Sequence, residues 1–281
     1  MPADDGRPAR LRPMTPRDID AGLRLCRLSN WNQVEDDWRC FLNSPAGGGW
    51  LAESNGIALG SVAYLRYGAS FTWLSMMLVD PQARRTGIGS RLLEAALEAF
   101  ANDSCVRLDA TPAGEPLYRG YGFVPESELV RCRLTAVPPG LARGTARPLE
   151  SGDLPQILAN DREVFGADRS DLLASFRSRA PEFAWISQSS YCFGRTGHRD
   201  AQIGPIVSES LSAACDLVVQ CLLNQRGRTV ILDVPRIPEW LGWLESAGFT
   251  VERPFLRMRR GENRHPGQPH RQFAIAGPEF G

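Results

Sequence analysis

The chain repeats itself, and this internal repetition limits it to folds that can occur twice along one polypeptide. Short words recur in the same order, about 130 residues apart. They pair Arg12–Ile19 with Arg147–Leu154, Leu108–Asp109 with Leu232–Asp233, and Gly122–Phe123 with Gly248–Phe249. Each half therefore opens with the same strand-and-turn signal and closes with an apolar strand, a helix and a Gly-Phe turn. The pattern favours a duplicated domain, and chance similarity between short common words is the alternative.

A stretch rich in proline and glycine lies between the two halves. Val137–Gly140 and Gly144–Ala146 have the composition of a linker. With 281 residues, the chain has room for two domains of ordinary size. We therefore predict one domain over residues 1–137, a linker over 138–146 and a second domain over 147–281.

The first half can be divided into elements. Two β-rich runs, Ile57–Arg66 and Phe71–Val79, are separated by a hairpin-like connection, and the second run is as apolar as a strand covered on both faces. Apolar residues recur at helical spacing over Ile88–Phe100, and Cys105–Ala110 forms the next strand. A hairpin followed by strand, loop, helix and strand indicates the α/β or α+β class.

The loop before that helix carries the strongest functional signal. Gly87 and Gly89 allow a tight turn and the close approach of a ligand. The free N–H groups and the dipole of the first helical turn attract an anion, and Arg84 and Arg85 can add phosphate contacts. The pattern predicts a pyrophosphate cradle. A tight strand-to-helix turn that binds no ligand is the alternative.

The residues around this loop resemble one family. The stretch Val79–Leu93 reads Val-Asp-Pro-x-x-Arg-x-x-Gly-x-Gly-x-x-Leu-Leu and resembles the acetyl-CoA loop of the GNAT N-acetyltransferase superfamily. Leu92 stands where a dinucleotide-binding Gly-x-Gly-x-x-Gly needs its third glycine. The resemblance implies a mixed, mostly antiparallel twisted sheet flanked by helices, with acetyl-CoA as the co-substrate. It assigns the following residues to that ligand: Leu78, Val79, Arg84, Arg85, Thr86, Gly87, Ile88, Gly89 and Ser90.

The same resemblance implies roles for the strand end and for a tyrosine. In the family, the main chain at the position of Leu78 and Val79 binds the pantetheine arm and polarises the thioester carbonyl. Leu117–Phe123 resembles the family's Leu-Tyr-x-x-x-Gly-Phe, which makes Tyr118 the general acid that protonates the departing thiolate. The alternative is a Tyr118 that only packs on its helix with its hydroxyl in water, with Tyr121 a second, unrelated tyrosine nearby.

A general base and an acceptor pocket are harder to assign. GNAT proteins often carry a glutamate on the apolar strand, but Trp73–Val79 holds no acid. The resemblance places the acceptor pocket near residues 31–37, where we select Trp31 and Asn32 as substrate-binding residues. Of the acids Glu35–Asp37, we expect at least two to lie on a solvated helical face beside a buried Trp38.

The second half has the same outline without the loop. After Gln202–Val207 the chain lacks a glycine pair and an arginine, and Leu244 occupies the tyrosine position. The stretches Leu108–Gly114, Gly204–Val207, Leu232–Pro235 and Ala274–Pro278 resemble bacterial tandem-GNAT proteins of the YitH type. That resemblance implies a degenerate second domain that walls the acceptor pocket. The candidate lining residues are Asp161, Phe165 and Arg169, together with Asp168, all on one apparent helix. An equal alternative is that Phe165 belongs to the core and the charged residues lie at the surface.

Charge and composition narrow the partners. Net charge is zero and the basic residues are spread along the chain, so neither nucleic acid nor an anionic membrane is the expected partner. The stretch Met1–Met14 is polar, no segment is long enough to span a bilayer, and the scattered, odd-numbered cysteines favour a reducing cytoplasm. The histidines have no ligand-like spacing, so we assign no metal.

The sequence therefore predicts an acetyl-CoA-dependent N-acetyltransferase, a monomer or homodimer, that acts on a small primary amine in a ternary complex. A protein N-acetyltransferase and a non-catalytic acyl-CoA sensor are the alternatives.

Overall fold

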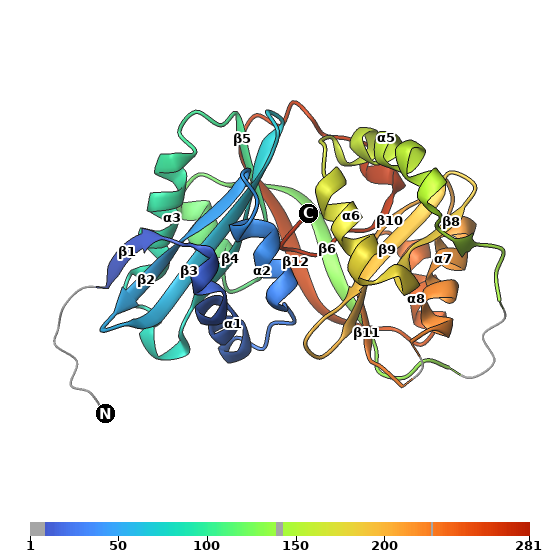
Figure 1. Ribbon diagram of the computed structural model, residues 1–281, viewed down its shortest axis with the longest axis horizontal. Helices are drawn as coiled ribbons and strands as arrows, with labels where there is room; N and C mark the ends of the chain where they lie inside the picture. The colour runs from blue at the N-terminus through green and yellow to red at the C-terminus, as the bar shows by residue number, and fades with distance from the viewer. Residues whose placement is uncertain (1–8, 139–142, 226) are drawn as a thin grey trace. The chain divides into compact units, whose positions relative to one another are not determined.

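The computed structural model describes residues 9–138, 143–225 and 227–281. The chain divides into Met1–Val106, here unit 1, and Arg107–Gly281, here unit 2. Both units combine helices with strands that pair mostly antiparallel (Figure 1), so the predicted mixed α/β fold class is confirmed. No helix within the described ranges is long and apolar enough to cross a membrane.

Within the described residues of unit 1, strands β1 to β4 pair antiparallel in the order in which they occur along the chain. They are β1 (Arg10–Pro13), β2 (Gly47–Ser54), β3 (Ile57–Tyr67) and β4 (Phe71–Val79). The predicted hairpin is β3–β4, and β4 is buried along most of its length, as its apolar sequence predicts.

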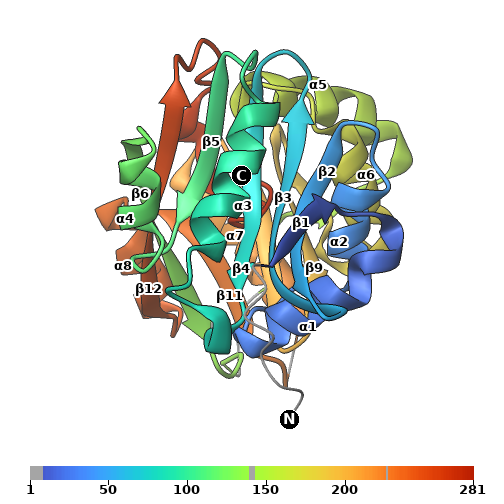
Figure 2. The ribbon, with the colours of Figure 1, turned by 90° about the vertical axis from the view of Figure 1, so that its left-hand side faces the viewer.

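Helices cover both faces of these strands. Figures 1 and 2 show α3 (Ile88–Ala99) on one face, and α1 (Ile19–Leu28) and α2 (Glu35–Leu42) on the other. The aromatic rings of Tyr64 and Phe100 meet edge to face beneath α3, with centroids 5.0 Å apart. Gly22 of α1 lets the buried Trp38 of α2 approach closely, because a Cβ there would lie 2.5 Å from the indole ring.

The strands of unit 2 follow the order β12-β6-β11-β10-β9-β8-β7, with β13 paired to β10 and the end of β5 beside β12. Strands β10 and β11 pair in parallel, whereas the pairs β10–β13, β10–β9, β11–β6, β12–β6, β7–β8 and β8–β9 are antiparallel. The strands are β5 (Cys105–Ala110), β6 (Val124–Leu134), β7 (Arg147–Pro148), β8 (Trp185–Ser187), β9 (Ser190–Thr196), β10 (Ala201–Val207), β11 (Val230–Pro235), β12 (Thr250–Gly261) and β13 (Gln272–Ala274).

Helices also flank the strands of unit 2. They are α4 (Glu115–Gly120), α5 (Leu154–Phe165), α6 (Ser170–Arg179), α7 (Leu211–Leu223) and α8 (Pro238–Ser246). Successive residues of β9 point to opposite faces: the Tyr191 hydroxyl donates to Asp161 on α5, whereas the Cys192 thiol meets Cys221 on α7 at 3.5 Å. The α7 and α8 side holds an extended apolar core, to which Trp240 contributes a fully buried ring.

The last strand of each sequence repeat pairs with the other repeat. Strand β6 closes the first repeat but lies between β12 and β11, both from the second repeat. Strand β12 closes the second repeat and neighbours β5 of the first. The two repeats therefore exchange their final strands within unit 2.

The turn that opens each repeat has the same geometry twice. Arg12 donates two hydrogen bonds to the carboxylate of Asp18, at 2.7 and 2.9 Å. Arg147 does the same to Asp153, at 2.7 and 2.8 Å. In both turns the aspartate also accepts a backbone N–H from the residue three positions earlier. The recurring sequence words thus correspond to recurring contacts.

The predicted domain boundaries remain a prediction. Residues 139–142 of the predicted linker lie outside the described residues. Within the described part, the backbone N–H groups of Thr145 and Ala146 donate to the carboxylate of Asp216 on α7. This end of the linker is therefore hydrogen-bonded to the helix.

Candidate active site

The loop between β4 and α3 is held by a few hydrogen bonds of its own. The carboxylate of Asp80 accepts the backbone N–H of Gln82 at 3.1 Å and a guanidinium N–H of Arg24 at 2.7 Å. The Thr86 hydroxyl donates to the carbonyl of Ala83 at 2.7 Å. These contacts fix the start of the loop while its end stays exposed.

The first turn of α3 opens to solvent. Gly87, the residue before the helix, has φ of 84°, and Arg85 has φ of 64°, so both adopt the left-handed conformation. A Cβ at Gly87 would meet no atom within 4 Å, which means that the space in front of the turn is open. The earliest backbone bond of the helix runs from the Arg91 N–H to the Gly87 carbonyl. The preceding N–H groups can therefore receive an anion.

The predicted loop residues contribute in different ways. Arg84, Arg85 and Thr86 are exposed, and the Arg84 guanidinium donates to the Val79 carbonyl at 3.3 Å. Ile88 is buried and packs beside Gly60 of β3, so only its backbone can face a ligand. The structure thus brings exposed cations and the N–H groups of the first helical turn together at one place.

A bulge interrupts β4 just before its end. Ser61 of β3 faces Leu78, but Ala63 faces Ser75, so β4 contains one residue more than β3 between these pairs. Met76 at the bulge has φ of 50°, and its carbonyl accepts the Ser61 hydroxyl at 3.0 Å. A bulge redirects a strand and leaves main-chain groups out of the ladder. Beyond the bulge the pairing resumes, because Leu78 and Val79 lie opposite Ser61 and Gly60 of β3.

Tyr118 lies on α4 in unit 2. Its ring meets Phe123 edge to face with centroids 5.8 Å apart, and the residue is 8% exposed. Burial raises the pKa of the Tyr118 phenol, so the group stays protonated near neutral pH. Its hydroxyl forms no hydrogen bond with any other residue that the structure describes, which leaves the proton available to a ligand. Tyr121 is half-buried at the end of the same helix.

The α1–α2 connection places the residues chosen for the acceptor. Trp31 is half-buried and Asn32 is buried. Glu35 and Asp36 face solvent, where both pair with Arg39. The third acid, Asp37, is buried and accepts the Val34 N–H at the start of α2. The expectation that at least two of the three acids are solvated beside a buried Trp38 is confirmed.

The sequence suggested that the candidate residues of the second half share one helix, but the structure divides them between α5 and the start of α6. Helix α5 ends at Phe165, because Gly166 turns left-handed, and Arg169 precedes α6. Asp161 and Arg169 nevertheless meet through two hydrogen bonds of 2.8 and 2.9 Å, and both are buried. Phe165 is core, as the alternative held, but these two charges are not at the surface. The sequence contained a signal for the start of a new helix. Asp168 is a helix-capping residue type, and its carboxylate accepts the N–H of Ser170, which begins α6.

The start of α7, in the second repeat, is closed by its own side chains. The Ser210 hydroxyl accepts the Ala213 N–H at 3.2 Å. The preceding residue, Glu209, pairs with Arg271. Such a capped turn offers fewer free donors than the turn at Gly87.

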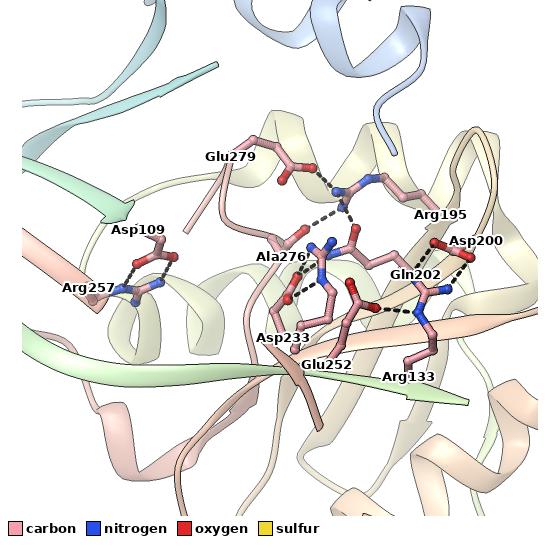
Figure 3. Close-up of polar contacts among 11 residues, drawn as sticks. Asp109, Arg133, Arg195, Asp200, Gln202, Asp233, Glu252, Arg257, Ala276 and Glu279 are labelled. Atoms are coloured by element: carbon pink, nitrogen blue, oxygen red, sulfur yellow. Dashed lines mark hydrogen bonds and ion pairs between the residues drawn. The ribbon is translucent and has the colours of Figure 1, made fainter. Parts of the chain in front are cut away.

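A buried polar network in unit 2 was not predicted. Asp233 on β11 accepts two hydrogen bonds from Arg131 and one from Gln202, all at 2.8 Å. Asp109 on β5 accepts two from Arg257, at 2.8 and 2.9 Å. Figure 3 shows the Asp109–Arg257 pair apart from the group around Asp233.

These two ion pairs are exchanged between the repeats. Arg131 and Arg257 stand at the same distance after the Gly-Phe turns, and Asp109 and Asp233 belong to the matching Leu-Asp words. Each aspartate pairs with the arginine of the other repeat. The ion pairs therefore join the exchanged strands β6 and β12 to their new neighbours.

No group of three or more His, Cys, Asp or Glu side chains in the described ranges could hold a metal ion.

Two family models match the chain, both for an acetyltransferase (GNAT) domain. One covers residues 45–125 and the other residues 157–274. The chain belongs to the GNAT acetyltransferases. It carries two GNAT domains in tandem, and it is an acyltransferase.

Named relatives and solved structures agree with this family. The holothin acyltransferase of a Pseudoalteromonas species is 27% identical over 89% of this chain and 87% of that protein. The uncharacterised N-acetyltransferase YitH of Bacillus subtilis is 23% identical over 76% of this chain and 77% of that protein. A putative acetyltransferase from Pyrococcus horikoshii shares the fold with a TM-score of 0.81 at 21% identity, over 98% of this chain and 96% of that one.

Proposed function

We propose that this protein is an acetyl-CoA-dependent N-acetyltransferase that transfers the acetyl group to a small primary amine. The observation that carries the proposal is the open first turn of α3, where a left-handed Gly87 leaves free N–H groups beside exposed arginines. Acetyl-CoA contains a pyrophosphate, and a helix N-terminus of this kind favours that group.

In this proposal the loop and the end of β4 bind the phosphates and the pantetheine arm of acetyl-CoA. The backbone from Gly87 to Ser90 and the side chains of Arg84, Arg85 and Thr86 contact the phosphates. The backbone of Leu78 and Val79 binds the pantetheine arm. The bulge at Met76 supports this, because a bulge just before the strand end redirects the strand and leaves a main-chain group out of the ladder. Binding both reactants side by side supplies the proximity that a bimolecular transfer lacks.

The transfer itself is a direct attack. The amine nitrogen bonds to the thioester carbon, the carbon–sulfur bond breaks, and the thiolate takes a proton from the Tyr118 hydroxyl. A phenol that forms no hydrogen bond to another described side chain is free to donate to a ligand, which fits this role. Trp73–Val79 holds no carboxylate, so a base comes from elsewhere in the protein or the amine arrives already neutral. No cysteine lies in the loop or beside Tyr118 in sequence, which favours direct transfer over an acyl-enzyme.

For the acceptor we propose contacts with Trp31 and Asn32, which combine a half-buried ring with a buried amide. Asp161, Phe165 and Arg169 remain proposed pocket residues of the second half. Because Asp161 and Arg169 neutralise each other while buried, we propose that they hold the pocket in shape. Phe165 stacks beneath the Arg169 guanidinium at 3.9 Å and supports it.

The test mixes the purified protein with acetyl-CoA and a broad panel of amines, and follows the release of free thiol. Turnover above hydrolysis with at least one small amine, together with the acetylated product by mass spectrometry, supports the proposal. Acetyl-CoA binding without turnover of any amine would instead favour a sensor. Turnover of peptides alone would favour a protein acetyltransferase.

A further inference from the structure

Arg253 on β12 is a second cation beside Arg131. The two residues face each other across the β12–β6 ladder. Their guanidinium groups stand 4.9 and 5.5 Å from the centroid of the Phe255 ring. Two like charges thus share one aromatic ring within unit 2, which is unfavourable unless anions balance both.

Only one of these two cations has a direct partner. Arg131 is bonded to Asp233, whereas Arg253 forms neither a hydrogen bond nor an ion pair with any residue that the structure describes, and its Nε atom is buried. Burial, followed by the charge of Arg131, lowers the pKa of Arg253. A half-buried guanidinium without an acceptor costs free energy that a bound anion would recover.

The carboxylates nearby are already engaged with other arginines. Besides Asp233, the charges of Glu252 and Glu279 reach Arg253. Glu252 pairs with Arg133 and Glu279 pairs with Arg195 (Figure 3). Arg253 therefore lies among negatively charged side chains, but none of those described forms a direct ion pair with it.

The repeats show that the fold does not need an arginine at this place. Arg131 and Arg257 occupy equivalent positions, and both form framework ion pairs. The position equivalent to Arg253, at the same distance after the Gly-Phe turn, is Ser127 in the first repeat. Both repeats thus contain the arginine of the ion pair with the Leu-Asp motif, whereas the arginine without a partner occurs in one repeat. This difference is expected of a residue that binds a ligand.

We propose that Arg253 binds a carboxylate of the ligand and that, resting on the proposed function, the acceptor amine is one that carries a carboxylate. A guanidinium holds a carboxylate through two parallel N–H···O bonds, and Phe255 offers an apolar surface beside it. The surrounding acids oppose a doubly charged phosphate more than a singly charged carboxylate. This favours an amino acid or a related amine over a phosphorylated one.

The experiment compares amines that differ only in the carboxylate. Suitable pairs are leucine with isoamylamine, phenylalanine with phenethylamine, and β-alanine with ethylamine. Each is assayed for thiol release and, by calorimetry, for binding to the wild-type protein, to Arg253→Gln and to the control Arg264→Gln. Arg264 is an exposed arginine of the same unit that pairs with Glu262.

We expect kcat/KM for the preferred carboxylate to exceed that of its neutral partner by about tenfold or more. Arg253→Gln should remove this preference mainly through KM and leave acetyl-CoA affinity unchanged, and Arg264→Gln should alter neither. Equal turnover of acid and neutral amines by the wild-type protein would overturn the carboxylate proposal while the transferase proposal stands.

The anion site at Arg253 can also be tested if the transferase proposal fails. If no amine is acetylated, the proposed function fails, and binding of the amino acids then decides the role of Arg253. Binding by the wild-type protein that Arg253→Gln loses would support the anion site. No binding, or equal binding by both proteins, would overturn it.

Discussion

Gly87→Ala tests the anion cradle at its most constrained residue. Gly87 has φ of 84°, a conformation that costs an alanine about 1–2 kcal/mol. A Cβ there meets no atom within 4 Å, so the substitution adds backbone strain without a clash. An alanine that relieves this strain rotates the peptide before α3 and moves its N–H away from the ligand. The loss of one hydrogen bond to a charged group is worth about 1.5–3 kcal/mol, or roughly tenfold to a hundredfold in Kd.

Gly56→Ala is the matched control. Gly56 lies in the β2–β3 turn of the same unit, has φ of 76°, and its Cβ would also meet no atom within 4 Å. Both substitutions should lower the free energy of unfolding in urea by a similar amount, about 1–2 kcal/mol. Calorimetry with acetyl-CoA should show weaker binding for Gly87→Ala alone. Unchanged affinity in Gly87→Ala, or the same loss in both variants, would refute the cradle.

Three further substitutions test other parts of the account. Tyr118→Phe should lower turnover by about a hundredfold or more with acetyl-CoA affinity unchanged, and steady-state kinetics with calorimetry would expose an unaltered rate. Asp233→Asn should destabilise the protein by about 3 kcal/mol in urea because it leaves Arg131 buried without its anion, and a loss no larger than that of exposed Glu262→Gln would contradict this. Hydrogen bonding to Arg12 lowers the pKa of Asp18 to about 2, below about 3.9 in the unfolded chain. Its stabilisation, about 1 kcal/mol, is present above that unfolded pKa and is lost as pH falls toward 2, so Asp18→Asn should destabilise at pH 7 and have little effect at pH 2.

Local elements could be predicted because each follows from a short pattern. The apolar run Phe71–Val79 is β4 as predicted, and the helical spacing from Ile88 gives α3, which ends one residue before the predicted Phe100. The repeated Arg-Pro words predicted the same turn twice, and the structure has it at Asp18 and Asp153. The break between α5 and α6 was missed although Gly166 marks it, since the charges around it continued a helical spacing.

The strand exchange could not be predicted from such patterns. Strands β6 and β12 have ordinary alternating sequences, and nothing local specifies a partner more than a hundred residues away. The Leu-Asp words were recognised as an echo, but that Asp109 pairs with Arg257 depends on the exchange. No sequence motif marks Arg253 as a binding residue, because its lack of a partner depends on which residues the fold places around it.

The most direct test of the central claim is a crystal structure of the protein with acetyl-CoA. The account predicts the pyrophosphate against the N–H groups from Gly87 to Ser90 and the thioester carbonyl at the main chain of Leu78 and Val79. It also predicts the sulfur within hydrogen-bonding reach of the Tyr118 hydroxyl. Acetyl-CoA bound at the start of α7, or bound with its sulfur remote from Tyr118, would contradict the account.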